Sequence, residues 1–113
     1  MSGGLAPTLS SYFFFIIIND LSLVLDRIKS SAIGKNQSLE INMVGGGLIF
    51  IYRSTMFVAY ACDIYGIIQP MYGNNQLVTI NQNGADGNSN TTIQYTIQNN
   101  TTSMLCILYI SYF

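Results

Sequence analysis

Residues 12–18 read Tyr-Phe-Phe-Phe-Ile-Ile-Ile, a run without a single polar or charged interruption. A looser apolar stretch extends over residues 5–25, and as a helix it would span about 31 Å, roughly the hydrocarbon thickness of a bilayer. Asn19 and Asp20 interrupt this stretch. Because one Asp near the centre of a membrane helix costs roughly 2.5 to 3.5 kcal/mol, the stretch makes a poor simple anchor. Its conformation decides the fold class.

Two interpretations of this region compete. In the first, Pro7 lies in the opening turn of one long helix that continues to Ile33 and ends at Gly34. In the second, residues 11–18 form a strand, favoured by aromatic and β-branched side chains, and Asn19 or Asp20 caps a separate helix over residues 21–33. Both predict an amphipathic helix in the second half, with a packing face at helical spacing that consists of Leu21, Val24, Leu25 and Ile28.

After Gly34 the apolar residues alternate with polar ones, which is the pattern of strands. The expected strands cover residues 39–43, 48–53, 55–63, 77–80, 93–98 and 103–113. Residues 64–76 and 81–90 are rich in Gly, Pro and Asn and are predicted to be irregular. The sequence therefore predicts an α+β protein. An apolar helix over residues 1–34 precedes a sandwich-like antiparallel β-domain of five to seven strands over residues 35–113.

Gly45-Gly46-Gly47 could suggest a phosphate-binding loop. Such loops lead into a helix, whereas the residues that follow, Leu-Ile-Phe-Ile-Tyr, have the composition of a strand. The glycines are therefore expected to form a hairpin turn.

The composition excludes several functional classes. The chain has four basic and five acidic residues, no histidine and no tryptophan. Without imidazole and with isolated acids, catalysis, a metal site and a bound cofactor are not expected. The few basic residues cannot neutralise many phosphates, so nucleic acid is not an expected partner, and no small-molecule substrate is expected either. A surface with so few charges suits a protein covered by a bilayer, by copies of itself or by glycans.

Two kinds of covalent modification have candidates in the sequence. Cys62 and Cys106 are the only cysteines, and they are either two free thiols or one disulfide. The glycosylation acceptor pattern occurs at four asparagines, namely Asn36, Asn90, Asn99 and Asn100.

The stretch Gly4-Leu5-Ala6-Pro7-Thr8-Leu9-Ser10, followed by the apolar run, resembles the start of archaeal type IV pilins. Residues 23–34 and the alternating strands after them are similar to the join between helix and β-sheet in that family. The resemblance covers about half the chain. It implies a subunit whose apolar helix lies in the membrane before assembly and in the filament core afterwards. It also implies an outward β-domain that is often glycosylated.

The expected function is thus that of a structural subunit of an extracellular filament, a pilus. The expected partners are copies of the same chain and, before assembly, the membrane, with the β-domain available for adhesion. The assembly interface is predicted at six consecutive residues, Phe13, Phe14, Phe15, Ile16, Ile17 and Ile18. Two alternatives remain open: a soluble α+β binding module in which residues 11–18 are a central strand, and another self-associating surface or virion β-protein.

Overall fold

The computed structural model describes residues 26–83 and 91–113, and 65% of the described residues lie in strands. The eight strands, in chain order, are β1 (Ile28–Ile33), β2 (Ser38–Val44), β3 (Gly47–Arg53), β4 (Met56–Cys62), β5 (Ile68–Gly73), β6 (Val78–Gln82), β7 (Thr92–Asn99) and β8 (Leu105–Ser111).

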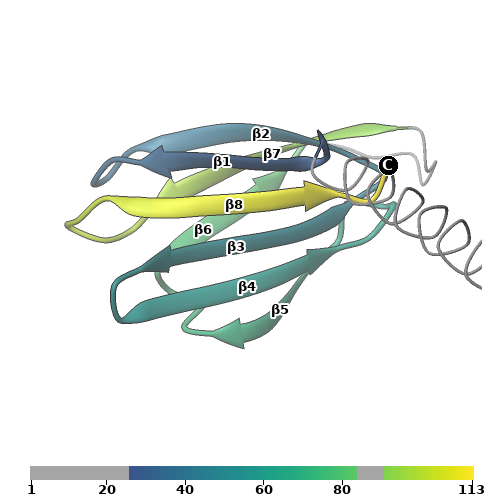
Figure 1. Ribbon diagram of the computed structural model, residues 1–113. Helices are drawn as coiled ribbons and strands as arrows, with labels where there is room; N and C mark the ends of the chain where they lie inside the picture. Colours follow the sequence, from purple (N-terminus) through teal and green to yellow (C-terminus); the bar gives the residue numbers. More distant parts are fainter. Residues whose placement is uncertain (1–25, 84–90) are drawn as a thin grey trace, which may run out of the picture.

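The strands form two antiparallel sheets. The larger sheet has the order β1-β8-β3-β4-β5, and the smaller has the order β2-β7-β6. Figure 1 shows the larger sheet in front, with β6 and β7 behind it. The first described strand pairs with the last, and the second pairs with the seventh. The segments at the two ends of the described chain therefore lie side by side, and the sandwich is held by contacts between residues distant in sequence.

The core lies between the two sheets. The alternation in β7 places Ile93, Tyr95 and Ile97 inside, each with no exposed surface. The larger sheet contributes apolar side chains to the same cluster, among them Ile51 and Ile107. Full burial of one such side chain contributes about 1.5–3 kcal/mol, so the inward rows of both sheets supply the main stabilisation of the fold. The half-buried strand expected over residues 93–98 is confirmed.

The α+β prediction is wrong, because the described part of the chain is all-β and contains no helix. The predicted helix reached Ile33, but Ile28–Ile33 is strand β1, paired from Ile28↔Ile110 to Ile33↔Leu105. The partner of this edge strand is β8, at the other end of the chain, so no local periodicity could reveal the pairing. The residues expected to form the helical packing face with Ile28, namely Leu21, Val24 and Leu25, lie outside the described residues. Since β1 belongs to the larger sheet, the β-structure begins before the expected boundary at residue 35.

The three strands expected between residues 39 and 63 are confirmed as β2, β3 and β4. The glycines between β2 and β3 do form a turn, but the hairpin prediction is wrong, because β2 pairs with β7 while β3 pairs with β4 and β8. The turn instead takes the chain from the smaller sheet to the larger one. Gly46 has φ +90°, and a Cβ there would meet the backbone carbonyl oxygens of Cys62 and Asp63. Only glycine fits this crossing.

Strand β5 lies where the sequence indicated irregular structure. It contains Pro70, which cannot donate to a sheet ladder, and the register with β4 shifts between Ala59 and Tyr60. Proline is tolerated there because β5 is an edge strand with one side unpaired. The breaker residues thus marked the edge of the sheet, not a gap between strands.

Candidate functional site

The outward face of the larger sheet is the most distinctive surface of the described chain. The pairing registers arrange its side chains in three rows across the strands. From β1 towards β5 these rows are Ala32, Cys106, Tyr52 and Phe57; then Ser30, Leu108, Phe50, Ala59 and Tyr72; then Ile28, Ile110, Leu48, Ala61 and Gln69. We call these residues the apolar face. None of them carries a charge.

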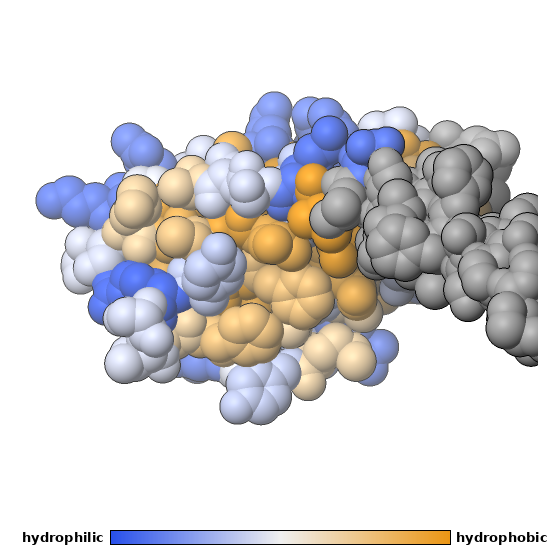
Figure 2. Space-filling model, viewed as in Figure 1, coloured by the Kyte–Doolittle hydropathy of each residue, from blue (hydrophilic) through white to orange (hydrophobic). Residues whose placement is uncertain are grey.

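Aromatic rings dominate one part of the apolar face. The rings of Phe50 and Phe57 stack with centroids 6.1 Å apart, and those of Phe57 and Tyr72 lie 5.7 Å apart at a tilted angle. Tyr72 is 68% exposed and Phe57 is 43% exposed. Figure 2 shows hydrophobic surface extending over the strands of this sheet. The rings therefore form a preformed apolar platform that water reaches.

The outward face of the smaller sheet has the opposite character. Along β2, β6 and β7 its side chains are polar at every position except Val44, and they are Ser38, Glu40, Asn42, Thr79, Asn81, Thr92, Gln94, Thr96 and Gln98. Several are linked by hydrogen bonds: the amide nitrogen of Asn83 donates to Gln94 over 2.8 Å, and that of Gln94 donates to Glu40 over 3.4 Å.

The two outward faces thus differ by chemistry and not by secondary structure. An antiparallel sheet commonly packs one face on the core and leaves the other in water, with polar residues outward. The smaller sheet follows that pattern and the larger does not. Large contiguous apolar patches on folded proteins are commonly sites of interaction with another macromolecule or a membrane.

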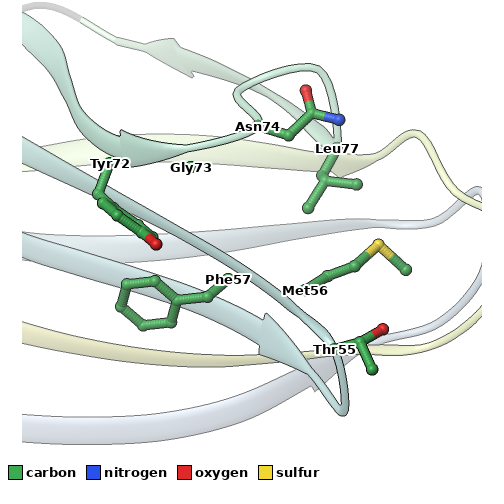
Figure 3. A pocket seen from close by; sticks show the side chains of 7 residues that line it. All are labelled: Thr55, Met56, Phe57, Tyr72, Gly73, Asn74 and Leu77. Carbon is green, nitrogen blue, oxygen red and sulfur yellow. The ribbon is translucent and has the colours of Figure 1, made fainter.

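A shallow cavity of about 290 Å³ opens at the corner of the apolar face, between the β3–β4 turn and the β5–β6 turn. Figure 3 shows the rings of Tyr72 and Phe57 side by side, and the side chain of Leu77 pointing towards Met56. The remaining lining residues are Thr55, Gly73 and Asn74. The lining contains no histidine, cysteine, lysine or carboxylate side chain. The cavity extends the apolar platform.

Charged residues gather instead in a cleft of about 400 Å³ between β1 and β2, whose lining includes Asp26, Arg27, Lys29 and Glu40. The guanidinium of Arg27 donates to the backbone carbonyl of Tyr112 over 2.9 Å. Both signs of charge are present, so the cleft does not select an anion or a cation.

The two cysteines are not bridged. Cys62 on β4 is buried, whereas the alternation on β8 places Cys106 on the apolar face. The intervening strand is β3, in which Gly47 pairs with both Cys62 and Ser111. Cys106 pairs with Tyr52, five residues further along β3. Two strand spacings and five residues along the strand separate them by about 19 Å, and a disulfide needs Cα atoms within about 7 Å. Of the two alternatives, the structure shows free thiols.

Cys62 lies beside the buried hydroxyl of Tyr95. Burial raises the pKa of the Cys62 thiol to about 11, an increase that the neighbouring Tyr95 hydroxyl partly offsets and that the charge of Asp63 reinforces. Burial also raises the pKa of Tyr95, as does the nearby Cys62. The Tyr95 hydroxyl would donate to a Cys62 thiolate, but with the thiol protonated no described residue meets the geometry of a hydrogen bond to this hydroxyl. Both groups therefore stay neutral and unreactive at physiological pH.

The glycosylation candidates differ in access. Asn36 lies exposed in the β1–β2 turn with φ +57°, and Asn100 is exposed although its amide donates to the Thr79 hydroxyl over 2.8 Å. Asn99 has no exposed surface, and its amide nitrogen donates to the carbonyl oxygens of Ile33, Gly34 and Ser103. A glycan on that nitrogen is incompatible with this fold. Asn90 lies outside the described residues.

The predicted assembly segment, Phe13, Phe14, Phe15, Ile16, Ile17 and Ile18, also lies outside the described residues. Within residues 26–83 and 91–113 no helix is long and apolar enough to span a membrane. In the same residues no three His, Cys, Asp or Glu side chains gather into a possible metal site.

The apolar face is the feature that sequence reasoning missed. A signal for it existed, because residues 48–52 and 105–110 are apolar at both alternating positions of their strands. Such a pattern is typical of a strand that is covered on both faces. The apolar face becomes one surface only when β8 is placed between β1 and β3.

No family model matches the chain, and searches of the curated proteins and of the solved structures found no significant similarity. The resemblance to archaeal type IV pilins stays a prediction from the sequence.

Proposed function

We propose that this protein is a structural subunit of an extracellular filament and assembles by covering uncharged surfaces with copies of itself. The observation that carries the proposal is the apolar face of the larger sheet, where no charged residue occurs and the rings of Phe57 and Tyr72 are open to water. The polar outward face of the smaller sheet suits the surface that remains in solvent after assembly. It is also where an adhesive contact would form.

The free energy gained by covering the apolar face supports assembly through more than one contact. Five strands and about six residues along each give the apolar face an area of about 480 Å². At about 25 cal/mol per Å², covering it contributes roughly 12 kcal/mol before the cost of association. That cost is about 4–15 kcal/mol, so a single contact through the apolar face is marginal. A filament subunit has a neighbour on each side, so each copy makes at least two contacts.

The test introduces a charge on each outward face. Phe57→Lys places an ammonium group on the apolar face, at a position exposed enough to tolerate it in the isolated chain. Asn42→Lys places the same group on the exposed polar face of the smaller sheet. Negative-stain microscopy and sedimentation of the full chain should show filaments for the parent protein and for Asn42→Lys, and their loss for Phe57→Lys.

Circular dichroism must show that both variants keep the strand content of the parent chain. A parent chain that stays monomeric at high concentration would overturn the proposal and favour a soluble binding module. Equal loss of filaments in both variants would show that the apolar face has no special part in assembly.

A further inference from the structure

We infer that the apolar face of one copy binds residues 12–18 of a neighbouring copy. The inference rests on the proposed function and names the contact through which the filament grows. Two uncharged surfaces of this chain would cover each other: a rigid sheet face with aromatic rings, and a seven-residue sequence made only of Tyr, Phe and Ile.

The dimensions of the two surfaces agree. The apolar face measures about 24 Å across its five strands and about 20 Å along them. Seven residues span about 10 Å as a helix and about 23 Å as a strand. In either conformation the segment fits within the face. Ala59 beside Phe50 is covered by its neighbours, whereas Ala61 beside Leu48 lines a hollow of about 150 Å³ at the edge of the face.

A second copy of the face is a less suitable occupant. A face-to-face contact is self-complementary, and it closes as a dimer instead of continuing as a filament. A contact between segment and face joins two different surfaces, so each copy can give one contact and receive another.

The attachment point of the segment favours the same arrangement. Ile28, where β1 begins, belongs to the apolar face, so the chain leaves the sandwich at the rim of that face. Nine residues lie between Ile18 and Ile28, and the ten steps from one to the other reach at most about 35 Å. That distance allows the segment to reach an adjacent copy. It also allows the segment to cover its own face, which the experiment must distinguish.

Cys106 provides a native probe, because it lies on the apolar face and is partly exposed, while Cys62 is buried. One partner is the unaltered chain. The other carries Cys106→Ser together with one new cysteine in the segment, at Phe13→Cys, Phe15→Cys or Ile17→Cys. The partners are mixed under assembly conditions and treated with a short bis-maleimide. A cross-linked species of twice the chain mass is expected for at least one segment position, with its link to Cys106 identified by mass spectrometry.

The matched control is Asn42→Cys in the Cys106→Ser chain, which places the new thiol on the polar face and should give several-fold less cross-linked product. Filaments without any link from the segment to Cys106 would overturn this inference and leave the proposed function standing. A link that forms only within single chains, tested with Ile17→Cys and native Cys106 together, would also overturn it. A chain that forms no filaments at all would overturn the proposed function.

Discussion

The side chain of Asn99 is bonded to the backbone of Ile33, with 3.0 Å between the amide nitrogen and the carbonyl oxygen. The same nitrogen donates to Ser103 over 2.8 Å, and the Asn99 oxygen accepts from the backbone nitrogen of Thr101 over 2.9 Å. This buried side chain therefore joins the end of β1 to the turn between β7 and β8. It links the end of β1 to the residues that lead into β8, the strand with which β1 pairs.

Asn99→Ala should destabilise the fold by about 3 kcal/mol, because several buried carbonyl and amide groups lose their partner at once. The matched control is Asn100→Ala, at an exposed neighbour, which should cost less than about 1 kcal/mol. Urea unfolding followed by circular dichroism measures both. Equal losses would show that the Asn99 bonds have no special role.

Tyr95→Phe should leave the fold as stable as the parent or stabilise it by about 1 kcal/mol. The substitution removes a buried hydroxyl that no described residue satisfies and keeps the ring that fills the core. Tyr60→Phe is the comparison, because the Tyr60 hydroxyl donates to the backbone carbonyl of Asn75 over 3.4 Å. A loss above about 1 kcal/mol in Tyr95→Phe would indicate a partner for this hydroxyl.

The stability should fall at alkaline pH. The pKa of Cys62 is raised from 9.0 to about 11 by burial, so above pH 9 the unfolded chain releases this proton while the folded chain keeps it. The stabilisation is fully present below pH 9 and is lost as the pH rises to about 11, by up to about 2 kcal/mol. Burial raises the pKa of Tyr60 and Tyr95 as well, which adds loss above pH 10.

Cys62→Ser removes the titrating thiol and should flatten the pH dependence between pH 9 and 10. The free energy of unfolding, measured in urea at several pH values, tests this. The same slope in the variant and in the parent would contradict the assignment to Cys62.

The two thiols should differ in reactivity. In the folded, unassembled chain a maleimide should label Cys106 on the apolar face and leave the buried Cys62 unmodified. Unfolding in urea should expose both. In filaments Cys106 should also become protected, because its face is covered. Mass spectrometry counts the labels, and labelling of Cys62 at the same rate as Cys106 in the native chain would contradict the structure.

Gly46→Ala should prevent folding or cost more than about 3 kcal/mol, since φ +90° and a collision with the Cys62 carbonyl oxygen act together. Gly34→Ala is the control, because a Cβ there meets only the flexible side chain of Gln37. Thermal unfolding of both variants provides the measurement. Tolerance of Gly46→Ala would mean that the crossing between the sheets can adopt another path.

The sequence by itself determined which residues alternate. Ile93, Tyr95 and Ile97 lie inside because a strand turns every second side chain to the same face, and this period is a local property of the backbone. The turn at Gly45 to Gly47 was also predictable, since a glycine run after one alternating segment and before another interrupts the strand.

Only the tertiary structure decided which strands are neighbours. The spacing of apolar residues up to Ile28 was compatible with a helix. Ile28 nevertheless lies in a strand, because β1 pairs with β8 at the other end of the chain. The apolar face has the same origin: Phe50, Leu108 and Ser30 share a row only because β8 inserts between β1 and β3. The period of two determines which side chains of a strand share a face. Contacts between residues far apart in the sequence determine which faces join into one surface.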